Sequence, residues 1–306
     1  MRDTGRGYAL AVANMVVSGA AVYVNSLGVR LFDDSTLYTA LKNLVAGLLL
    51  LVPFAVSARA RSGLRVAPRS RGLLVAVALI GGSVPYALYF RGLQLSTPVT
   101  AGLIDHLQFL LVAAFAAAFL GERFGMGVWA ALVVLLVGLS FGVSVSAVRL
   151  DEGTIYLAAA TCLFAADFAL MKYLLRSVAP VTVMAAKMTL GSLLLLCWVA
   201  LSGRLGAVAG LRPLQAGFVL VTGLILVLFT ATSVLGLRLA SATAVTAIPA
   251  GAPLITTMLV VISRRAAIPL TRWLGLALVL AAVAAIILLG SRQERLAAER
   301  GRRDAA

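Results

Sequence analysis

The sequence has little charge and few of the side chains that soluble enzymes use. Only 12% of its 306 residues are charged, and it contains two cysteines and one histidine. Hydrophobic residues make up 62%, with a mean hydropathy of +1.05. This composition is too apolar for one or two water-soluble domains. About ten apolar spans of roughly 20 residues each leave only short connections, which excludes a soluble catalytic or nucleic-acid-binding domain.

Few motifs for chemistry are present. Cys162 and Cys197 both lie inside apolar stretches, which indicates packing residues rather than a disulfide framework or a metal site. The ATP-binding motif G-x-x-x-x-G-K-[ST] is absent, and so is H-E-x-x-H. We therefore expect no cofactor, no metal and no enzymatic activity, with an intramembrane enzyme as a remote alternative.

Apolar runs, cut at charged residues, proline and glycine, predict ten spans. They cover residues 7–28, 36–57, 72–94, 98–120, 126–147, 153–175, 181–202, 213–239, 242–263 and 270–290. Each is long enough to cross the bilayer as a helix. The unbroken apolar runs differ from the alternating strands of a membrane barrel. The predicted fold class is an all-α membrane protein.

The positive charge predicts how the chain is oriented. Its formal net charge of +15 would suggest a nucleic-acid partner in a soluble protein, but here no such partner is expected. With the N-terminus inside, 16 lysines and arginines fall on the inner side and eight on the outer. The positive-inside rule then predicts a multi-pass protein of the plasma (inner) membrane with both termini in the cytoplasm. We expect residues 291–306 to form a basic cytoplasmic tail, and no cleavable signal at the N-terminus.

The two halves of the chain are related in sequence. Gly92-Leu-Gln-Leu95 matches Gly236-Leu-Arg-Leu239 at a spacing of 144, and Trp129 matches Trp273 at the same spacing. This predicts a five-helix repeat at 1–150 and a second one at 151–290. An odd number of spans makes the second repeat enter the membrane from the opposite side. Many secondary transporters use such inverted repeats for alternating access around a midplane site.

On these residues the chain resembles the EamA-type branch of the drug/metabolite transporter superfamily. The resemblance is carried by residues 87–98, by the span that ends Phe119-Leu-Gly-Glu-Arg123, and by Gly127, Trp129 and Gly138. The second copy keeps residues 236–242 and Pro253. It departs from the pattern at residues 264–266, where Arg-Arg-Ala replaces the Gly-Glu, and Phe109 stands at the position that matches Pro253.

Five ionisable residues lie more than one helical turn from the ends of the predicted spans: Lys42, Asp105, His106, Asp167 and Lys187. Each costs about 2.5–3.5 kcal/mol to insert, so each is a candidate for substrate binding or coupling. Counted by depth, Lys42 and Asp105 form one possible pair near the outer side, and Lys187 and Asp167 a second near the inner side. Such groups also suit the two ends of a zwitterionic substrate, and the lysines alternatively extend to the headgroups.

Asp105 and His106 are adjacent in the fourth span, and both can border one cavity. Protonation there can couple to substrate, because histidine titrates near neutral pH. The alternative is a structural histidine that donates to a neighbouring helix.

Polar stripes mark the expected cavity wall. Asn14, Ser18 and Asn25 recur on one face of the first span. The remaining candidates are Gln108, one turn beyond Asp105, then Gly82, Tyr86 and Tyr89 in the third span, and Thr230 and Ser233 in the eighth. An aromatic wall suits an organic solute. Hydrogen bonds between helices are the alternative role for these residues.

Backbone breakers predict hinges in two spans. Gly81, Gly82 and Pro85 interrupt the third span, and Pro249 and Pro253 interrupt the ninth. Static kinks are the alternative. Gly138 and Gly142 have the GxxxG spacing of close helix packing, which leaves a monomer and a weak homodimer both open.

These features predict a secondary transporter of small organic solutes that works by alternating access at a midplane cavity. A proton or solute gradient would drive it. The resemblance implies an exporter of amino acids or related metabolites as the commonest role. Multidrug or cation efflux, solute uptake and a facilitative channel are the alternatives.

Overall fold

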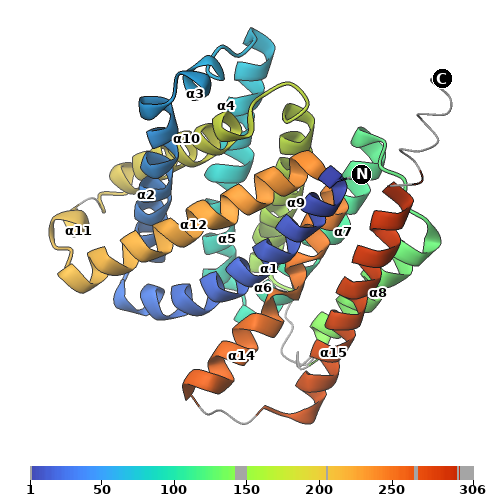
Figure 1. Ribbon diagram of the computed structural model, residues 1–306. Helices are drawn as coiled ribbons and strands as arrows, with labels where there is room; N and C mark the ends of the chain where they lie inside the picture. The colour runs from blue at the N-terminus through green and yellow to red at the C-terminus, as the bar shows by residue number, and fades with distance from the viewer. Residues whose placement is uncertain (1, 142–149, 205, 265–267, 295, 297–306) are drawn as a thin grey trace.

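The computed structural model describes residues 2–141, 150–204, 206–264, 268–294 and 296. Within these residues the chain is helical and contains no strand. Nine of the described helical segments are long and apolar enough to cross a membrane, and a tenth, Met126–Ser140, is apolar but shorter. The predicted all-α membrane fold is therefore confirmed (Figure 1).

The first half of the chain forms five crossings, with the third and fourth each divided into shorter helices. Its elements are α1 (Arg2–Gly28), η1 (Val29–Leu31), α2 (Ser35–Val56), α3 (Ala58–Ser62), α4 (Pro68–Gly82), α5 (Val84–Leu95), α6 (Pro98–His106), α7 (Gln108–Phe115), the π-helical turn η2 (Ala116–Leu120) and α8 (Met126–Ser140).

The second half repeats this order. Its elements are α9 (Glu152–Leu174), α10 (Pro180–Leu201), α11 (Gly206–Ala209), α12 (Pro213–Leu239), α13 (Ala242–Ala247), η4 (Pro249–Gly251), α14 (Ala252–Arg264), α15 (Leu270–Ala285) and the π-helical turn η5 (Ile286–Gly290). Because five crossings, an odd number, precede α9, the two repeats enter the bundle from opposite sides.

Contacts between the repeats occur in matching sets. Helix α1 of the first repeat corresponds to α9 of the second, and α5 corresponds to the later part of α12. Helix α1 packs on α12, and in the same way α9 packs on α5. Helix α2 packs on its own counterpart α10, and α8 on its counterpart α15 (Figure 1). This reciprocity is what a two-fold relation between inverted repeats produces.

Glycines bring the repeats close together. A Cβ built on Gly82 would lie 2.9 Å from Gly191 Cα, and one built on Gly138 would lie 2.9 Å from the Gly275 carbonyl oxygen. Small residues at such crossings allow backbones to approach closely within a membrane. Gly138 of the GxxxG spacing therefore packs inside the bundle, while Gly142 lies outside the described residues.

Among the described residues, three crossings are interrupted. The third breaks at Ser83, between α4 and α5, and the ninth passes through the 3-10 turn η4, as the glycine and proline patterns predicted. The fourth also breaks, at Leu107, where the sequence indicated a continuous helix. Leu107 and Gly251 are 144 residues apart, the spacing of the repeat, so the fourth and ninth crossings are interrupted at equivalent positions.

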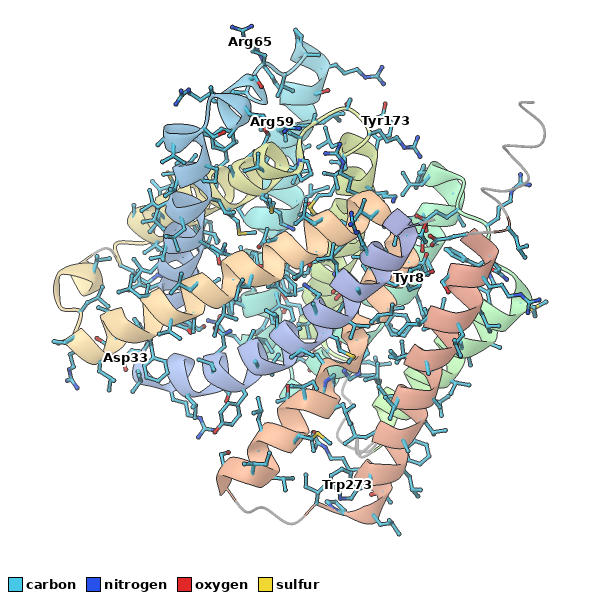
Figure 2. The ribbon with its side chains drawn as sticks, viewed as in Figure 1. Tyr8, Asp33, Arg59, Arg65, Tyr173 and Trp273 are labelled. Carbon is cyan, nitrogen blue, oxygen red and sulfur yellow. The ribbon has the colours of Figure 1, made fainter. Side chains whose placement is uncertain are left out.

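The bundle has two ends that we distinguish by their residues. We call the end with Tyr8, residues 57–67 and Glu122 the terminal face, and the end with residues 29–34, 202–204 and 206–212 the distal face. Figure 2 places Arg59, Arg65 and Tyr173 toward the terminal face and Asp33 and Trp273 at the opposite side. Most of the predicted basic tail at 291–306 lies outside the described residues.

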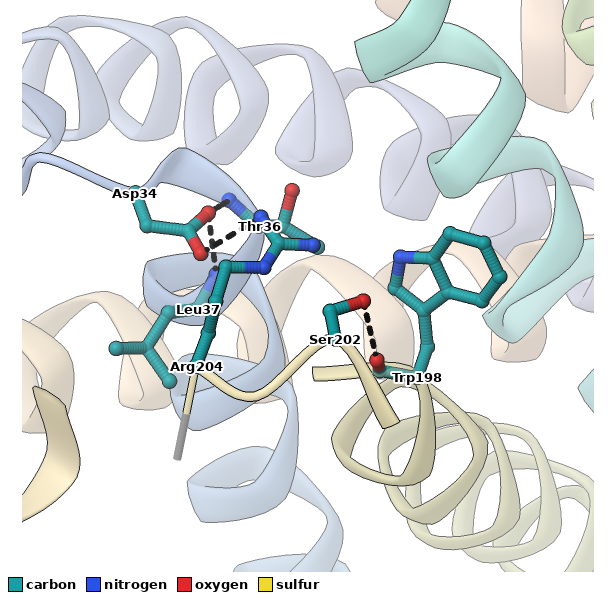
Figure 3. Close-up of polar contacts among 6 residues, drawn as sticks. All are labelled: Asp34, Thr36, Leu37, Trp198, Ser202 and Arg204. Atoms are coloured by element: carbon teal, nitrogen blue, oxygen red, sulfur yellow. Dashed lines mark hydrogen bonds and ion pairs between the residues drawn. The ribbon is translucent and has the colours of Figure 1, made fainter. Parts of the chain in front are cut away.

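A capped helix stabilises the distal face. Asp34 accepts hydrogen bonds from the backbone N–H groups of Thr36 (2.8 Å) and Leu37 (3.2 Å) at the start of α2. Its second oxygen pairs with Arg204 at 2.9 Å, which ties the two repeats together at this end (Figure 3).

Candidate functional site

Two adjoining cavities occupy the middle and the distal part of the bundle. The central cavity, of about 340 Å³, is lined by Asn14, Asp105, His106, Gln108 and Thr246 together with phenylalanine and proline side chains. The distal cavity, of about 490 Å³, is lined by Asn25, Tyr38, Lys42, Tyr89 and Thr222. Both cavities are also lined by Ser18, Val22 and Phe229, so they meet along α1. Their sizes suit small organic ligands, whose pockets span about 300–1,000 Å³.

The interrupted helices build the central cavity. Asp105, His106 and Gln108 surround the break between α6 and α7, and Pro249 and Ala250 belong to the equivalent break η4 in the other repeat. Transporters place substrate groups at such discontinuous helices because the freed backbone groups face a cavity rather than lipid. The α6–α7 break and η4, which are equivalent in the repeat, thus each form one wall of the central cavity.

Several acceptors in the central cavity lack a partner within the described residues. The Asp105 side chain is exposed in the cavity and makes no ion pair or hydrogen bond with another described residue. His106 is half-buried, and its buried Nδ1 has no partner. The buried Oδ1 of Asn14 also has none. Buried polar atoms are normally satisfied, so the Asn14 oxygen and the His106 nitrogen leave room for a partner that the described side chains do not supply.

Asn14 also joins the two repeats. Its Nδ2 group lies 2.8 Å from the Phe229 carbonyl, 2.8 Å from Thr232 Oγ1 and 2.9 Å from Ser233 Oγ, all on α12. The structure therefore gives Asn14 and Ser233 a contact between helices. Thr230 is buried one turn away, and its hydroxyl has no partner within the described residues.

Lys42 does not pair with Asp105. Its Nζ donates to Asn25 Oδ1 at 3.1 Å and lies 5.4 Å from the centre of the Tyr38 ring, while the Tyr38 hydroxyl donates to the same Asn25 oxygen at 2.9 Å. The possible pair that the depth count suggested does not form, because depth does not determine which helices meet. Helix α2 contacts α10 and α12, and Lys42 lines the distal cavity, whereas Asp105 lines the central one.

Lys187 and Asp167 do form an ion pair. Asp167 is fully buried, and Lys187 also lies 5.7 Å from the centre of the Phe168 ring. A Cβ at Gly81 would overlap the Asp167 carboxyl group, so Gly81 provides the space that this carboxylate occupies. Lys42 and Lys187 hold equivalent positions in the repeat, yet only Lys187 has an acidic partner among the described residues.

The aromatic candidates separate into two places. Tyr89 lines the distal cavity, and Tyr86 packs edge-on against Phe164 with the ring centres 5.2 Å apart. Three phenylalanines that the sequence did not single out as a wall, Phe109, Phe168 and Phe229, line the central cavity instead.

A hydrogen-bonded latch lies between the central cavity and the terminal face. Gly121 ends the fourth crossing in the left-handed conformation (φ 71°), which favours glycine, and so turns the chain for Glu122. The Glu122 carboxylate accepts from the backbone N–H groups of Ala242 (2.6 Å) and Thr243 (3.3 Å) and from the Thr243 hydroxyl (3.2 Å). It thereby caps α13 of the opposite repeat. Burial raises the pKa of the Glu122 carboxyl, and these hydrogen bonds act against that rise.

Further bonds support the latch. Lys172 donates to the carbonyl oxygens of Leu237 and Ala240 at the end of α12, both at 2.6 Å. Glu294 accepts from the Tyr8 hydroxyl (3.1 Å) and the Ser241 backbone N–H (3.2 Å). Residues 242–247 are mostly buried, and Val245 and Thr246 already line the central cavity. The described contacts therefore hold α13 in place beside the cavity.

The fold and the cavity define a multi-pass membrane protein in which two inverted repeats enclose a polar site. The model of the EamA-like transporter family matches residues 5–143 and 152–288, one copy for each repeat. The chain therefore belongs to the EamA-like transporter family and is a membrane transporter of small solutes.

Comparison with other proteins agrees on the fold. One solved crystal structure, described only as that of a protein, has a similar fold. The TM-score is 0.77 at 20% sequence identity, and the match covers 94% of this chain and 99% of that chain. At this identity the likeness shows the shared architecture alone. No curated protein matches the sequence.

Proposed function

We propose that this chain is a secondary transporter that carries an amino acid or a related small organic solute through the central cavity by alternating access. The observation that carries the proposal is the cavity itself. It lies where both repeats are interrupted, and it adjoins a second cavity toward the distal face. On its other side the Glu122 latch holds the start of α13, and we take this side to be closed. A carrier requires a central site with one side closed.

The side chains of the two cavities support a zwitterionic solute. Asp105 has no counter-charge among the described residues and suits an ammonium group, with Phe109, Phe168 and Phe229 beside an apolar body. Lys42 has only neutral described partners and suits a carboxylate in the adjoining cavity. An organic cation is the second candidate, because it needs Asp105 and the rings but not Lys42.

Orientation and coupling complete the proposal. With both termini in the cytoplasm, the latch closes the cytoplasmic side, and the described conformation faces outward. Asp105 and the adjacent His106 are the proposed coupling groups, so that a proton or solute gradient drives export. The hinges proposed at Gly81, Gly82 and Pro85, and at Pro249 and Pro253, accommodate the motion between the two states.

Counterflow in proteoliposomes tests the function. The panel contains neutral amino acids, amines without a carboxylate and carboxylates without an amine. We expect saturable exchange of an amino acid, a loss of about tenfold or more in Asp105→Asn because a charge-assisted contact is removed, and unchanged exchange in Asp33→Asn, which removes an exposed charge at the distal face. Lys42→Met is expected to abolish amino-acid exchange. Retained amine exchange in that variant would identify the organic cation as the solute. No exchange above empty liposomes, or full activity of Asp105→Asn, would contradict the proposal.

A further inference from the structure

A second cavity with a different chemical character lies at the terminal face. This basic hollow, of about 680 Å³, is lined by Arg59, Arg65 and Arg238, and no acidic residue lines it. The first two arginines belong to α3 and the loop after it, and the third to the last turn of α12. All three side chains are exposed, and none makes a hydrogen bond or ion pair with another described residue. Figure 2 shows Arg59 and Arg65 at this end of the bundle.

Two helices begin at the same hollow. Ala67 and Ala179, the residues before α4 and α10, both line it, and each is followed by a proline in the first helical turn. Neither helix has a side-chain cap, in contrast to α2 and α9, where Asp34 and Asp151 accept from the first turn. An uncapped helix start presents free N–H groups and the positive end of the helix dipole. These starts add to the positive potential of the three guanidinium groups.

Hydroxyl groups complete a set of donors. Ser70 and Ser177 line the hollow, and their side-chain hydroxyls make no hydrogen bond with another described residue. Guanidinium, hydroxyl and backbone N–H groups from α3, α4, α10 and α12 thus surround one space. A group with several oxygen acceptors and more than one negative charge satisfies such a set best. Phosphate has this character, and arginine binds it through paired N–H groups.

We propose that the basic hollow binds the phosphate group of an anionic ligand, at a site separate from the central cavity. Residues of both repeats form the site, and the Thr182 hydroxyl donates to the Gly63 carbonyl (3.0 Å) beside it, which holds the repeats together there. Two sources can supply the group. One is the headgroup of an anionic phospholipid, which basic pockets between membrane helices bind, and the other is a soluble phosphate compound.

The test compares two triple variants with the same charge. The hollow variant carries Arg59→Gln, Arg65→Gln and Arg238→Gln, which together remove the charge from the hollow. The control variant carries Arg30→Gln, Arg91→Gln and Arg272→Gln, which remove three exposed arginines that lie outside it. Purified full-length protein is titrated with inorganic phosphate against sodium chloride of equal ionic strength, followed by thermal shift. Vesicles of phosphatidylcholine with and without phosphatidylglycerol, followed by native mass spectrometry of retained lipid, form the second arm.

We expect the hollow variant to bind about tenfold less tightly than the control variant, since each lost contact is charge-assisted. A difference in the lipid arm alone identifies the headgroup as the source, and a difference in the phosphate arm identifies a soluble ligand. Equal binding by the two variants in both arms would overturn the proposal. If the hollow variant does not fold, a measurement on the unaltered protein still tests the proposal. Phosphate or phosphatidylglycerol should slow phenylglyoxal modification of Arg59, Arg65 and Arg238 several-fold but not that of Arg30, and uniform rates would also overturn the proposal.

Discussion

Glu122 and Thr243 belong to opposite repeats, yet the carboxylate of Glu122 accepts hydrogen bonds from both the backbone N–H and the hydroxyl of Thr243. These contacts explain why the fourth span ends in Leu-Gly-Glu. Gly121 takes the left-handed conformation, and Glu122 then reaches the start of α13. In the second repeat, Ala266 stands at the equivalent position in the sequence, so the Leu-Gly-Glu pattern is kept in the first repeat only.

Loss of the Glu122 carboxylate is expected to loosen the start of α13. Glu122→Ala removes the acceptor for the N–H groups of Ala242 and Thr243, which should cost about 1–2 kcal/mol, as for a lost helix cap. Hydrogen-exchange mass spectrometry should show faster exchange of these two amides. Glu152→Ala, which removes an exposed glutamate from the first turn of α9, is the control. Equal exchange of residues 242–243 in both variants and in the unaltered protein would contradict the latch.

Gly81 is expected to tolerate no side chain. In Gly81→Ala the added methyl group would overlap the Asp167 carboxyl group, which should destabilise the protein by about 1–3 kcal/mol, as overpacking does. Gly72→Ala is a matched control in the same helix, because a Cβ at Gly72 meets no atom within 4 Å. Thermal denaturation in detergent measures both. A Gly81→Ala protein as stable as the Gly72→Ala protein would contradict the contact.

The Lys187–Asp167 pair is expected to serve stability rather than solute binding. Asp167→Asn leaves a buried ammonium without its counter-charge and should cost about 3–5 kcal/mol, whereas replacing both partners by Leu and Met should restore most of the stability. Thermal denaturation gives the stability, and counterflow gives the activity. If the double variant is stable but inactive, the pair takes part in transport, and this interpretation is wrong.

Asp105 should behave in the opposite way. Because Asp105 has no described partner to leave behind, Asp105→Asn is expected to keep the thermal stability within about 0.5 kcal/mol while it loses exchange. Comparing Asp105→Asn with Asp167→Asn on the same two measurements separates a solute contact from a structural one. A marked loss of stability in Asp105→Asn would assign this carboxylate a structural role.

Much of the fold follows from composition and the repeat, but the contacts do not. Span lengths and the 144-residue spacing predicted two five-helix repeats, and glycine and proline predicted the breaks at Ser83 and at η4. The break at Leu107 has no proline or glycine beside it, and only its equivalence to Gly251 in the repeat points to it. Symmetry thus carries information that local propensity lacks.

The site could be predicted only in part because depth along a helix does not fix rotation around it. Asp105 and Lys42 were placed at one depth, yet they line different cavities. Lys187 and Asp167 were matched by the same count, and they do meet because Gly81 leaves space beside them. The phenylalanines of the central cavity look like any other apolar residue of a span, so only the packed structure distinguishes Phe168 and Phe229.

Accessibility of a cysteine in the central cavity from each side of the membrane tests the carrier most directly. Cys162 and Cys197, both exposed on the bundle, are first replaced by alanine, and Gln108→Cys, at the wall of the cavity, is added. In sealed vesicles of known orientation, a membrane-impermeant thiol reagent should modify Gln108→Cys from the distal face. Without solute, it should act from the terminal face several-fold more slowly, and Glu122→Ala or added solute, which lets the carrier turn over, should raise that rate. Equal rates from both faces with Glu122 intact and no solute, or no modification from either face under any condition, would contradict a central site that opens to one side at a time.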